Sequence, residues 1–141
     1  MSRVFLDTNV IIYLLEDYGE LSLSATELAQ KMIDRGDEVV TSTMTIGEVM
    51  VKPLAIGDQV LERKYRQLFD SPEVELMNFD RTAAMLYAVI RQDKKIKSPD
   101  AIQLACAAAA RCDLFITNDD RLSKKVVPGI QFIVSLDRVP I

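Results

Sequence analysis

Short apolar runs alternate along the chain with segments whose apolar residues recur at helical spacing. The apolar runs show little alternation of polar and apolar positions, which is typical of parallel strands covered on both faces. On this basis we expect strands at residues 4–7, 39–42, 71–79, 113–117 and 130–134.

The segments between these runs have the periodicity of amphipathic helices. We expect helices at residues 9–16, 24–36, 45–57, 58–69, 81–92, 98–110 and 119–126. Asp58 and Asp80 are placed to cap two of them, Pro53 to disturb one, and Ser98 to cap another whose first residue is Pro99. Strands that alternate with helices predict an α/β fold, in which helices cover both faces of a parallel sheet and residues 45–69 form a helical arm.

The chain of 141 residues has the length of one ordinary domain, so we expect a single domain over residues 1–141. No segment approaches the roughly 18 uninterrupted apolar residues of a membrane span. The N-terminal residues MSRVFLD lack the features of an export signal. We therefore expect a cytoplasmic protein without a membrane partner.

The sequence contains no histidine and two cysteines. A Ser-His-Asp triad, a HExxH metalloprotease site and a thiol–histidine nucleophile all lack a necessary residue. Cys106 and Cys112 are therefore interpreted as packing residues, in keeping with the burial preference of free cysteine. Carboxylates remain as the abundant acid–base and ligand groups.

Four carboxylates occupy comparable places beside the predicted strands. They are Asp7, Glu48, Asp100 and Asp119. Because ligands of open parallel sheets bind beyond the carboxyl ends of the strands, these acids can converge on one edge. Each has an alternative role when considered alone: Asp7 as a helix cap, Glu48 as a solvent-exposed helix residue, Asp100 as a favourable charge at a helix N-terminus, and Asp119 as a turn residue.

Thr8, Asn9 and Thr117 offer further small oxygen ligands or hydrogen-bond partners beside these acids. Such a set of hard oxygen ligands suits Mg²⁺ or Mn²⁺. The bound ion can acidify a water, polarise a phosphoryl oxygen and stabilise a leaving alkoxide, and it requires no histidine. The pattern therefore favours metal-dependent phosphoryl chemistry.

The motifs LDTN, TIGE, SPDAIQLA and FITND, in this order, resemble those of the PIN-domain nucleases, and most closely the toxin ribonucleases of bacterial VapBC toxin-antitoxin modules. The resemblance covers nearly the whole chain and includes VMVKPLAIGD after the glutamate. It implies a PIN-like α/β/α sandwich that cuts RNA with Mg²⁺ or Mn²⁺, and a cognate antitoxin. We also expect a homodimer.

By residue-wise match, the resemblance implies that the catalytic and metal-binding residues are the same four acids, supported by Thr8, Asn9 and Thr117. The shared TxD spacing favours Asp119 over Asp120 as the fourth acid. Arg111-Cys112 stands where family members often have a glycine.

Three other functions are weighed against this one. A phosphoacceptor domain would need an acceptor aspartate at the end of a middle strand, where the sequence has TST, and a haloacid-dehalogenase-like phosphatase would need an aspartate where Asn9 stands. A catalytically silent PIN-like module that binds RNA or a protein is the more serious alternative. The presence of all four acids opposes it, and a cleavage assay would distinguish the two.

The net charge of −4 argues weakly against a nucleic-acid partner, but basic residues flank the proposed site. The candidates for RNA phosphate binding are Lys52, Arg91, Lys94, Lys95 and Lys97. A solvated loop and helix face would explain the same residues. Likewise, Ile12, Leu15 and Leu61 could line a dimer or antitoxin surface, although helical periodicity explains them equally well.

Overall fold

A sheet of five parallel strands forms the centre of the molecule. The computed structural model describes residues 1–140, and its strands are β1 (Arg3–Leu6), β2 (Glu38–Ser42), β3 (Val74–Met77), β4 (Leu114–Thr117) and β5 (Phe132–Ser135). Their order across the sheet is β3-β2-β1-β4-β5, and every neighbouring pair is parallel. The predicted parallel sheet is confirmed.

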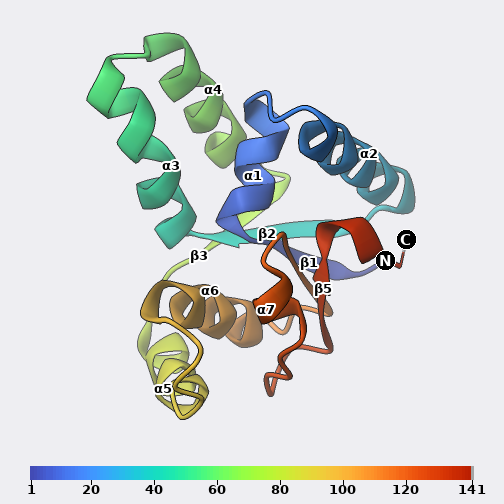
Figure 1. Cartoon of the computed structure of the whole chain (residues 1–141), viewed down its shortest axis with the longest axis vertical. Coiled ribbons are helices and arrows are strands. Elements are labelled where there is room, and N and C mark those ends of the chain that lie inside the picture. The colour runs from blue at the N-terminus through green and yellow to red at the C-terminus, as the bar shows by residue number, and fades with distance from the viewer. Residues whose placement is uncertain (141) are drawn as a thin grey trace.

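Helices cover both faces of this sheet (Figure 1). The helices are α1 (Thr8–Leu15), α2 (Glu20–Arg35), α3 (Thr43–Ile56), α4 (Gln59–Asp70), α5 (Arg81–Ile90), α6 (Ser98–Ala109), α7 (Asp120–Ser123) and the 3-10 helix η1 (Leu136–Arg138). Helices α1 to α4 lie on one face, where α3 and α4 form the predicted arm, and α5 to α7 lie on the other. Within residues 1–140, none of the helices combines the length and apolar character needed to cross a membrane.

Some helix boundaries differ from those expected. Helix α2 begins at Glu20 and α3 at Thr43, each earlier than expected, and α3 continues through Pro53 to Ile56. Helix α6 has Lys97 rather than Ser98 as its N-cap residue. Ser98 instead begins the helix, and its hydroxyl lies 2.8 Å from the hydroxyl of Tyr87 on α5.

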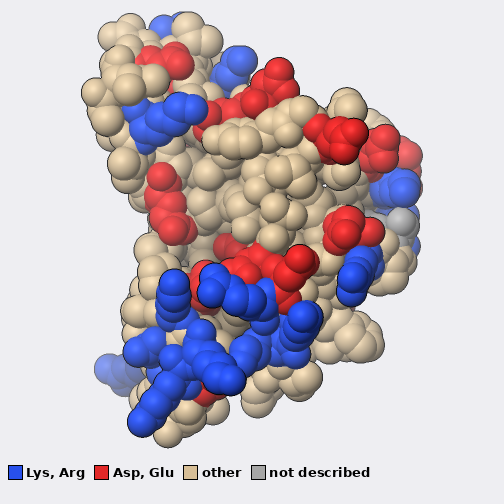
Figure 2. Space-filling view, viewed as in Figure 1, with Lys and Arg blue, Asp and Glu red and all other residues tan. Residues whose placement is uncertain are grey.

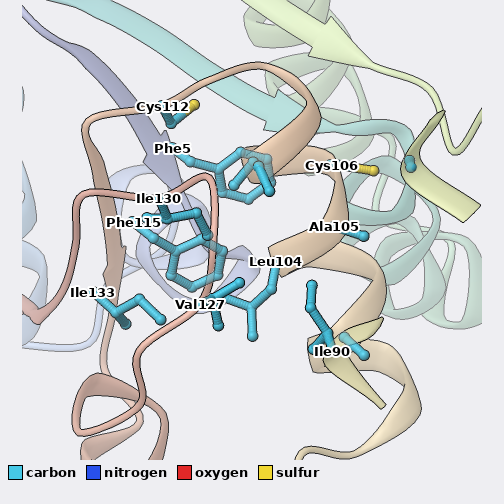
Figure 3. Close-up of a cluster of buried hydrophobic side chains, with 14 of the residues drawn as sticks. Phe5, Ile90, Leu104, Ala105, Cys106, Cys112, Phe115, Val127, Ile130 and Ile133 are labelled. Carbon is cyan, nitrogen blue, oxygen red and sulfur yellow. The ribbon is translucent and has the colours of Figure 1, made fainter. Parts of the chain in front are cut away.

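Two apolar clusters, one on each side of the sheet, form the core. In the cluster beneath α5 to α7, Phe5 of β1 and Phe115 of β4 stack with their ring centroids 5.1 Å apart (Figure 3). Cys106 and Cys112 are buried free thiols in this cluster, and burial raises their pKa values to about 11 and about 12. Both cysteines are therefore packing residues, as predicted. Leu61 is also buried, in the opposite cluster, so the alternative that it lines a surface is wrong.

Helix α6 ends in a left-handed turn. The backbone N–H of Arg111 donates to the carbonyl of Ala108, and that of Cys112 donates to the carbonyl of Ala107. Arg111 has φ 54°, a conformation that glycine adopts far more readily. The backbone thus explains why glycine would suit this position.

Candidate active site

Four carboxylates gather beyond the carboxyl ends of the central strands. Asp7 directly follows β1 and Asp119 lies two residues after β4, while Glu48 is on α3 after β2 and Asp100 is near the start of α6. Strands β1 and β4 are neighbours, and the chain proceeds from β1 to β2 on one side and from β4 to β5 on the other. The acids therefore surround the switch point of the sheet, where parallel α/β folds bind ligands.

Asp7 is the buried member of this cluster, with an exposed fraction of 7%. It is the N-cap of α1, and its Oδ1 accepts a hydrogen bond of 2.9 Å from the backbone N–H of Thr8. Its Oδ2 accepts from the hydroxyl of Thr117, at 2.8 Å. The capping role and the place in the acidic cluster therefore coexist in one residue.

The environment of Asp7 disfavours its negative charge. Burial raises the pKa of Asp7 to about 6, and the nearby charges of Asp100 and Glu48 add to that rise. The hydrogen bonds from Thr117 and Thr8 oppose the rise, because they stabilise the ionised form. A cation at this point would relieve both the desolvation and the repulsion.

Asp100 and Asp119 form the more open side of the cluster and line one pocket of about 600 Å³. Burial raises the pKa of Asp100, as do the charges of Asp119 and Glu48, while Lys97 and Arg121 oppose the rise. Asp119 caps α7 by accepting from the backbone N–H of Arg121. Asp120 is exposed at the start of α7 and is not among the residues that line this pocket.

Glu48 lies on the exposed side of α3, but its carboxylate is held by a hydroxyl. Thr8 Oγ1 donates to Glu48 Oε1 at 2.6 Å. Thr8 in turn accepts a hydrogen bond of 2.9 Å from Gln103 Nε2 on α6. Sequence reasoning missed Gln103, although a polar residue three positions after Asp100 in an apolar helix was a usable signal.

Asn9 and Thr117 connect α1 to the end of β4. The Thr117 hydroxyl accepts from the backbone N–H of Asp119 at 3.1 Å and from Asn9 Nδ2 at 3.4 Å. Asn9 Oδ1 accepts from the backbone N–H of Asn118 at 3.2 Å. All three predicted supporting residues therefore hydrogen-bond within the cluster or to its acids.

The donor set fits a hard divalent cation in its chemistry. The cluster offers only oxygen ligands, and one of its carboxylates is buried with a raised pKa beside two others. Within residues 1–140, no three acidic or thiol side chains already stand in the geometry of a closed metal site.

Comparison with known families identifies the fold that carries this cluster. The family model of the PIN domain matches residues 4–127. The chain belongs to the PIN domain family. A comparison with curated protein sequences found no significant match.

Solved structures of toxin-antitoxin systems share the fold of this PIN domain. A chain of a toxin-antitoxin complex from Klebsiella pneumoniae is 26% identical, with a TM-score of 0.68 over 92% of this chain and 95% of that chain. VapBC2 from Rickettsia felis, bound to a DNA fragment from its promoter, is 14% identical, with a TM-score of 0.73 over 94% and 97%. DNA-bound VapBC from Salmonella typhimurium is 19% identical, with a TM-score of 0.67 over 96% and 99%.

Basic side chains of the PIN domain gather on one side of the acids. The loop before α6 contributes Lys94, Lys95 and Lys97 to the pocket that Asp100 and Asp119 line. The segment from α7 onward adds Arg121, Lys124 and Lys125 to the same pocket. We call these six residues the basic surface. Figure 2 shows lysine and arginine atoms massed directly beside the acidic centre.

Sequence reasoning missed the half of the basic surface that follows β4. The signal was present, because RLSKK directly follows TNDD in the sequence. The two halves are joined by an ion pair of 2.8 Å between Lys125 and Asp93.

Lys52 and Arg91 lie outside the lining of this pocket. Lys52 forms an ion pair of 2.7 Å with Glu16 beside the helical arm. Arg91 Nη1 donates to the carbonyl of Ile96, at 2.7 Å, and so braces the loop that carries the lysines. Their predicted contacts with RNA stay predictions.

Proposed function

We propose that this PIN domain is a metal-dependent endoribonuclease that hydrolyses RNA phosphodiester bonds. The observation that carries the proposal is the carboxylate cluster around buried Asp7 in a chain without histidine. Asp7, Glu48, Asp100 and Asp119 are the proposed metal ligands. Mg²⁺ or Mn²⁺, when bound, supplies an acidified water and stabilises charge on the phosphate and the leaving oxygen.

The protein residues hold the ligands in place. The Thr117 hydroxyl fixes one oxygen of Asp7, and the Thr8 hydroxyl fixes one oxygen of Glu48. Each donor stabilises the ionised carboxylate, which is the form that binds a cation. Asn9 supports Thr117 at the end of β4. The site is therefore pre-organised on the ends of rigid elements rather than on a mobile loop.

The basic surface is the proposed contact for RNA phosphates. The acidic cluster by itself repels a polyanion, so the cations beside it must offset this repulsion. Lys94, Lys95, Lys97 and Lys124 form no salt bridge within residues 1–140 and remain available to phosphates. Single-stranded RNA is the proposed substrate, because an extended strand can cross the open pocket between these lysines and Asp119.

Dependence on the carboxylates tests the proposed activity directly. RNA cleavage by the purified protein should require Mn²⁺ or Mg²⁺ and should stop in excess chelator. Asp7→Asn, Glu48→Gln, Asp100→Asn and Asp119→Asn should each lower kcat by about 100-fold or more, because each removes one charge at nearly constant shape. The matched control is Asp120→Asn, next to Asp119 but exposed, which should retain activity.

Undiminished cleavage in chelator would reject metal dependence. Folded protein that binds RNA but never cleaves it, in either metal and across several RNAs, would favour the catalytically silent binding module. Equal losses in Asp119→Asn and Asp120→Asn would show that both neighbouring acids serve the site.

We also propose that the nuclease is the toxin of a type II toxin-antitoxin pair in the cytoplasm. The 26% identity to a chain of a toxin-antitoxin complex, over 92% of this protein, supports this proposal. Expression alone should arrest growth, and co-expression with the product of the neighbouring reading frame should restore it. The Asp7→Asn protein should be harmless at equal abundance. Unimpaired growth of cells that contain active nuclease would replace the toxin with an RNA-processing enzyme.

A homodimer is the proposed oligomeric state. Exposed apolar side chains are present on α3 and α5, among them Val51, Met85 and Val89, and they support a protein contact through these helices. Light scattering after size-exclusion chromatography should give twice the chain mass, and Met85→Glu should return a monomer. A monomeric wild-type protein at high concentration would reject the dimer.

A further inference from the structure

A buried chain of hydrogen bonds lies behind the acidic cluster and is not explained by packing alone. Its centre is Gln103 on α6, with an exposed fraction of 2%. The side-chain amide contacts three hydroxyls. Nε2 donates to Thr45 at 2.7 Å and to Thr8 at 2.9 Å, and Oε1 accepts from Ser42.

The hydrogen bonds around Thr8 favour one direction for its proton. An amide nitrogen has two hydrogens, and here one is directed at Thr45 and the other at Thr8. The Thr8 oxygen therefore accepts from Gln103, and its single proton can be donated to the Glu48 carboxylate, 2.6 Å away. The Thr45 hydroxyl, 3.1 Å from that of Thr8, is the other acceptor that this proton could reach, and the shorter distance of 2.6 Å and the negative charge of a carboxylate favour Glu48.

The same amide also connects the elements that carry the acids. Thr8 begins α1 beside Asp7, Thr45 lies one turn before Glu48 on α3, and Gln103 lies one turn after Asp100 on α6. Ser42 ends β2, and the hydroxyl of Thr41 on the same strand donates to the Leu6 carbonyl at 3.0 Å. A displacement of any of these helices would leave buried polar atoms unpaired, which is costly.

We propose that Gln103 is a positioning residue of the acidic site, which directs the Thr8 hydroxyl at Glu48 and so holds that carboxylate ready for a divalent cation. The inference rests on the proposed function for its purpose, but its hydrogen-bond chain exists without metal. Hydrogen-bonded groups that orient metal ligands from behind typically contribute 10- to 100-fold in metal affinity. An apolar side chain of the same length at position 103 could not supply this orientation.

The first test is metal affinity, measured by calorimetry with Mn²⁺ alone. Gln103→Met, which preserves length and removes the amide, should weaken Mn²⁺ binding by about tenfold or more. Leu104→Met is the matched control, because it alters a fully buried neighbour on the same helix without removing a hydrogen bond. It should leave Mn²⁺ affinity unchanged.

A double-mutant cycle separates positioning from general loosening of the fold. If Gln103 acts through the Thr8 hydroxyl, Gln103→Met should have little further effect on Mn²⁺ affinity once Thr8→Val has removed that hydroxyl. If the losses of Mn²⁺ binding free energy in the two single variants add in full in the double variant, the proposal is overturned. An unchanged affinity in a folded Gln103→Met protein would also overturn it.

The second test needs no metal and no variant of Gln103. In metal-free protein, Glu48→Gln replaces the acceptor of the Thr8 hydroxyl and should shift the side-chain amide resonances of Gln103 in NMR spectra, because linked hydrogen bonds polarise one another. Asp119→Asn, which removes the same charge without touching Thr8, should shift them less. The response to Glu48→Gln should vanish in the Thr8→Val background.

The two tests fail separately. The positioning role is overturned if Glu48→Gln leaves the Gln103 amide resonances unshifted, or if it shifts them equally in the Thr8→Val background. This holds even when RNA is cleaved. A Gln103 response that depends on Thr8, in a protein that binds no Mn²⁺, supports the positioning role and rejects the proposed metal-dependent function instead.

Discussion

At the scale of single residues, Asp7 shows how one side chain serves both the fold and the site. It caps α1 through the backbone of Thr8, yet it is buried beside Asp100 and Glu48, whose charges raise its pKa further. A cap alone could remain in solvent, where its charge would cost little. The burial of this carboxylate is therefore a structural cost that a bound cation would offset.

This burial predicts an unusual pH dependence of stability in metal-free protein. The pKa of Asp7 is about 6 in the fold, against an ordinary value of 3.8, so the folded state binds the proton more tightly. The free energy of unfolding should fall as pH rises from about 4 to about 6, by at most about 3 kcal/mol from this group. Urea denaturation in excess chelator, repeated across this pH range, measures the free energy of unfolding.

The Asp7→Asn variant is the control for that prediction. It cannot titrate, so the fall between pH 4 and pH 6 should be smaller in the variant than in wild-type protein by the contribution of Asp7. If the free energy of unfolding falls equally with pH in both proteins, burial does not raise the pKa of Asp7, and the prediction is wrong.

Arg111 is a second residue whose backbone conformation carries a cost. A left-handed conformation costs an ordinary residue roughly 1–2 kcal/mol, and glycine would avoid this cost. Glycine also has more conformational freedom in the unfolded state, which reduces its benefit by about 0.5–1 kcal/mol. Arg111→Gly should therefore raise the free energy of unfolding by up to about 1 kcal/mol. Arg111→Ala, which keeps the strained conformation, should give no such gain in the same denaturation experiment.

At the scale of elements, aspartates decide where several helices begin. Asp58 accepts from the backbone N–H of Leu61 at 3.0 Å at the start of α4, and Asp80 accepts from that of Ala83 at 2.9 Å at the start of α5. Both caps were predicted from the sequence, because a cap depends on residues only a few positions away. The cap of α6 was predicted one residue too late, since Ser98 bonds to Tyr87 on another helix.

The cap of α4 allows a simple stability test of the helical arm. Asp58→Ala should lower the free energy of unfolding by about 1 kcal/mol, because it leaves the N–H of Leu61 without its side-chain acceptor. Asp58→Asn keeps an acceptor oxygen and should lose less. Chemical denaturation of the three proteins decides it, and equal stability of wild type and Asp58→Ala would show that water replaces the cap without cost.

At the scale of the whole molecule, charge is divided sharply across the site. The acids occupy the edge of the sheet, and lysine and arginine side chains mass beside them (Figure 2). Met44, Val51 and Phe79 line a shallow apolar pocket that includes Glu48 and none of the basic residues. The net charge of −4 does not convey this division. An RNA backbone is therefore expected to approach from the basic side.

The basic surface predicts the salt dependence of RNA binding. Lys94→Glu, Lys95→Glu and Lys97→Glu, made singly and measured in chelator so that no cleavage occurs, should each weaken binding. The slope of log K against log salt is negative, and each lost phosphate contact should make it less steep by about 0.7 for a single strand. Lys31→Glu on α2, which makes the same charge reversal outside this pocket, should leave the slope unchanged. Unchanged slopes for all the loop variants would return these lysines to a solvated surface.

The sequence by itself determined the succession of strands and helices along the chain and the edge of the sheet to which the acids belong. Both follow from local rules: periodicity selects the element, and parallel strands joined by helices bring their carboxyl ends to one edge. Asp7 directly follows β1 and Asp119 lies two residues after β4, so both fall at the carboxyl edge of a parallel sheet, whereas the structure decided that β1 and β4 are neighbours.

Only the tertiary structure decided which side chains complete that edge. Gln103 and Leu61 lie in helical patterns that allow burial or exposure, and packing against other helices buried both. Lys124 joined the lysines before α6 because the segment after β4 folds back beside that loop, whereas Lys52 and Arg91 found partners elsewhere. The physical reason is that these contacts join residues far apart in the chain, and periodicity records only near neighbours.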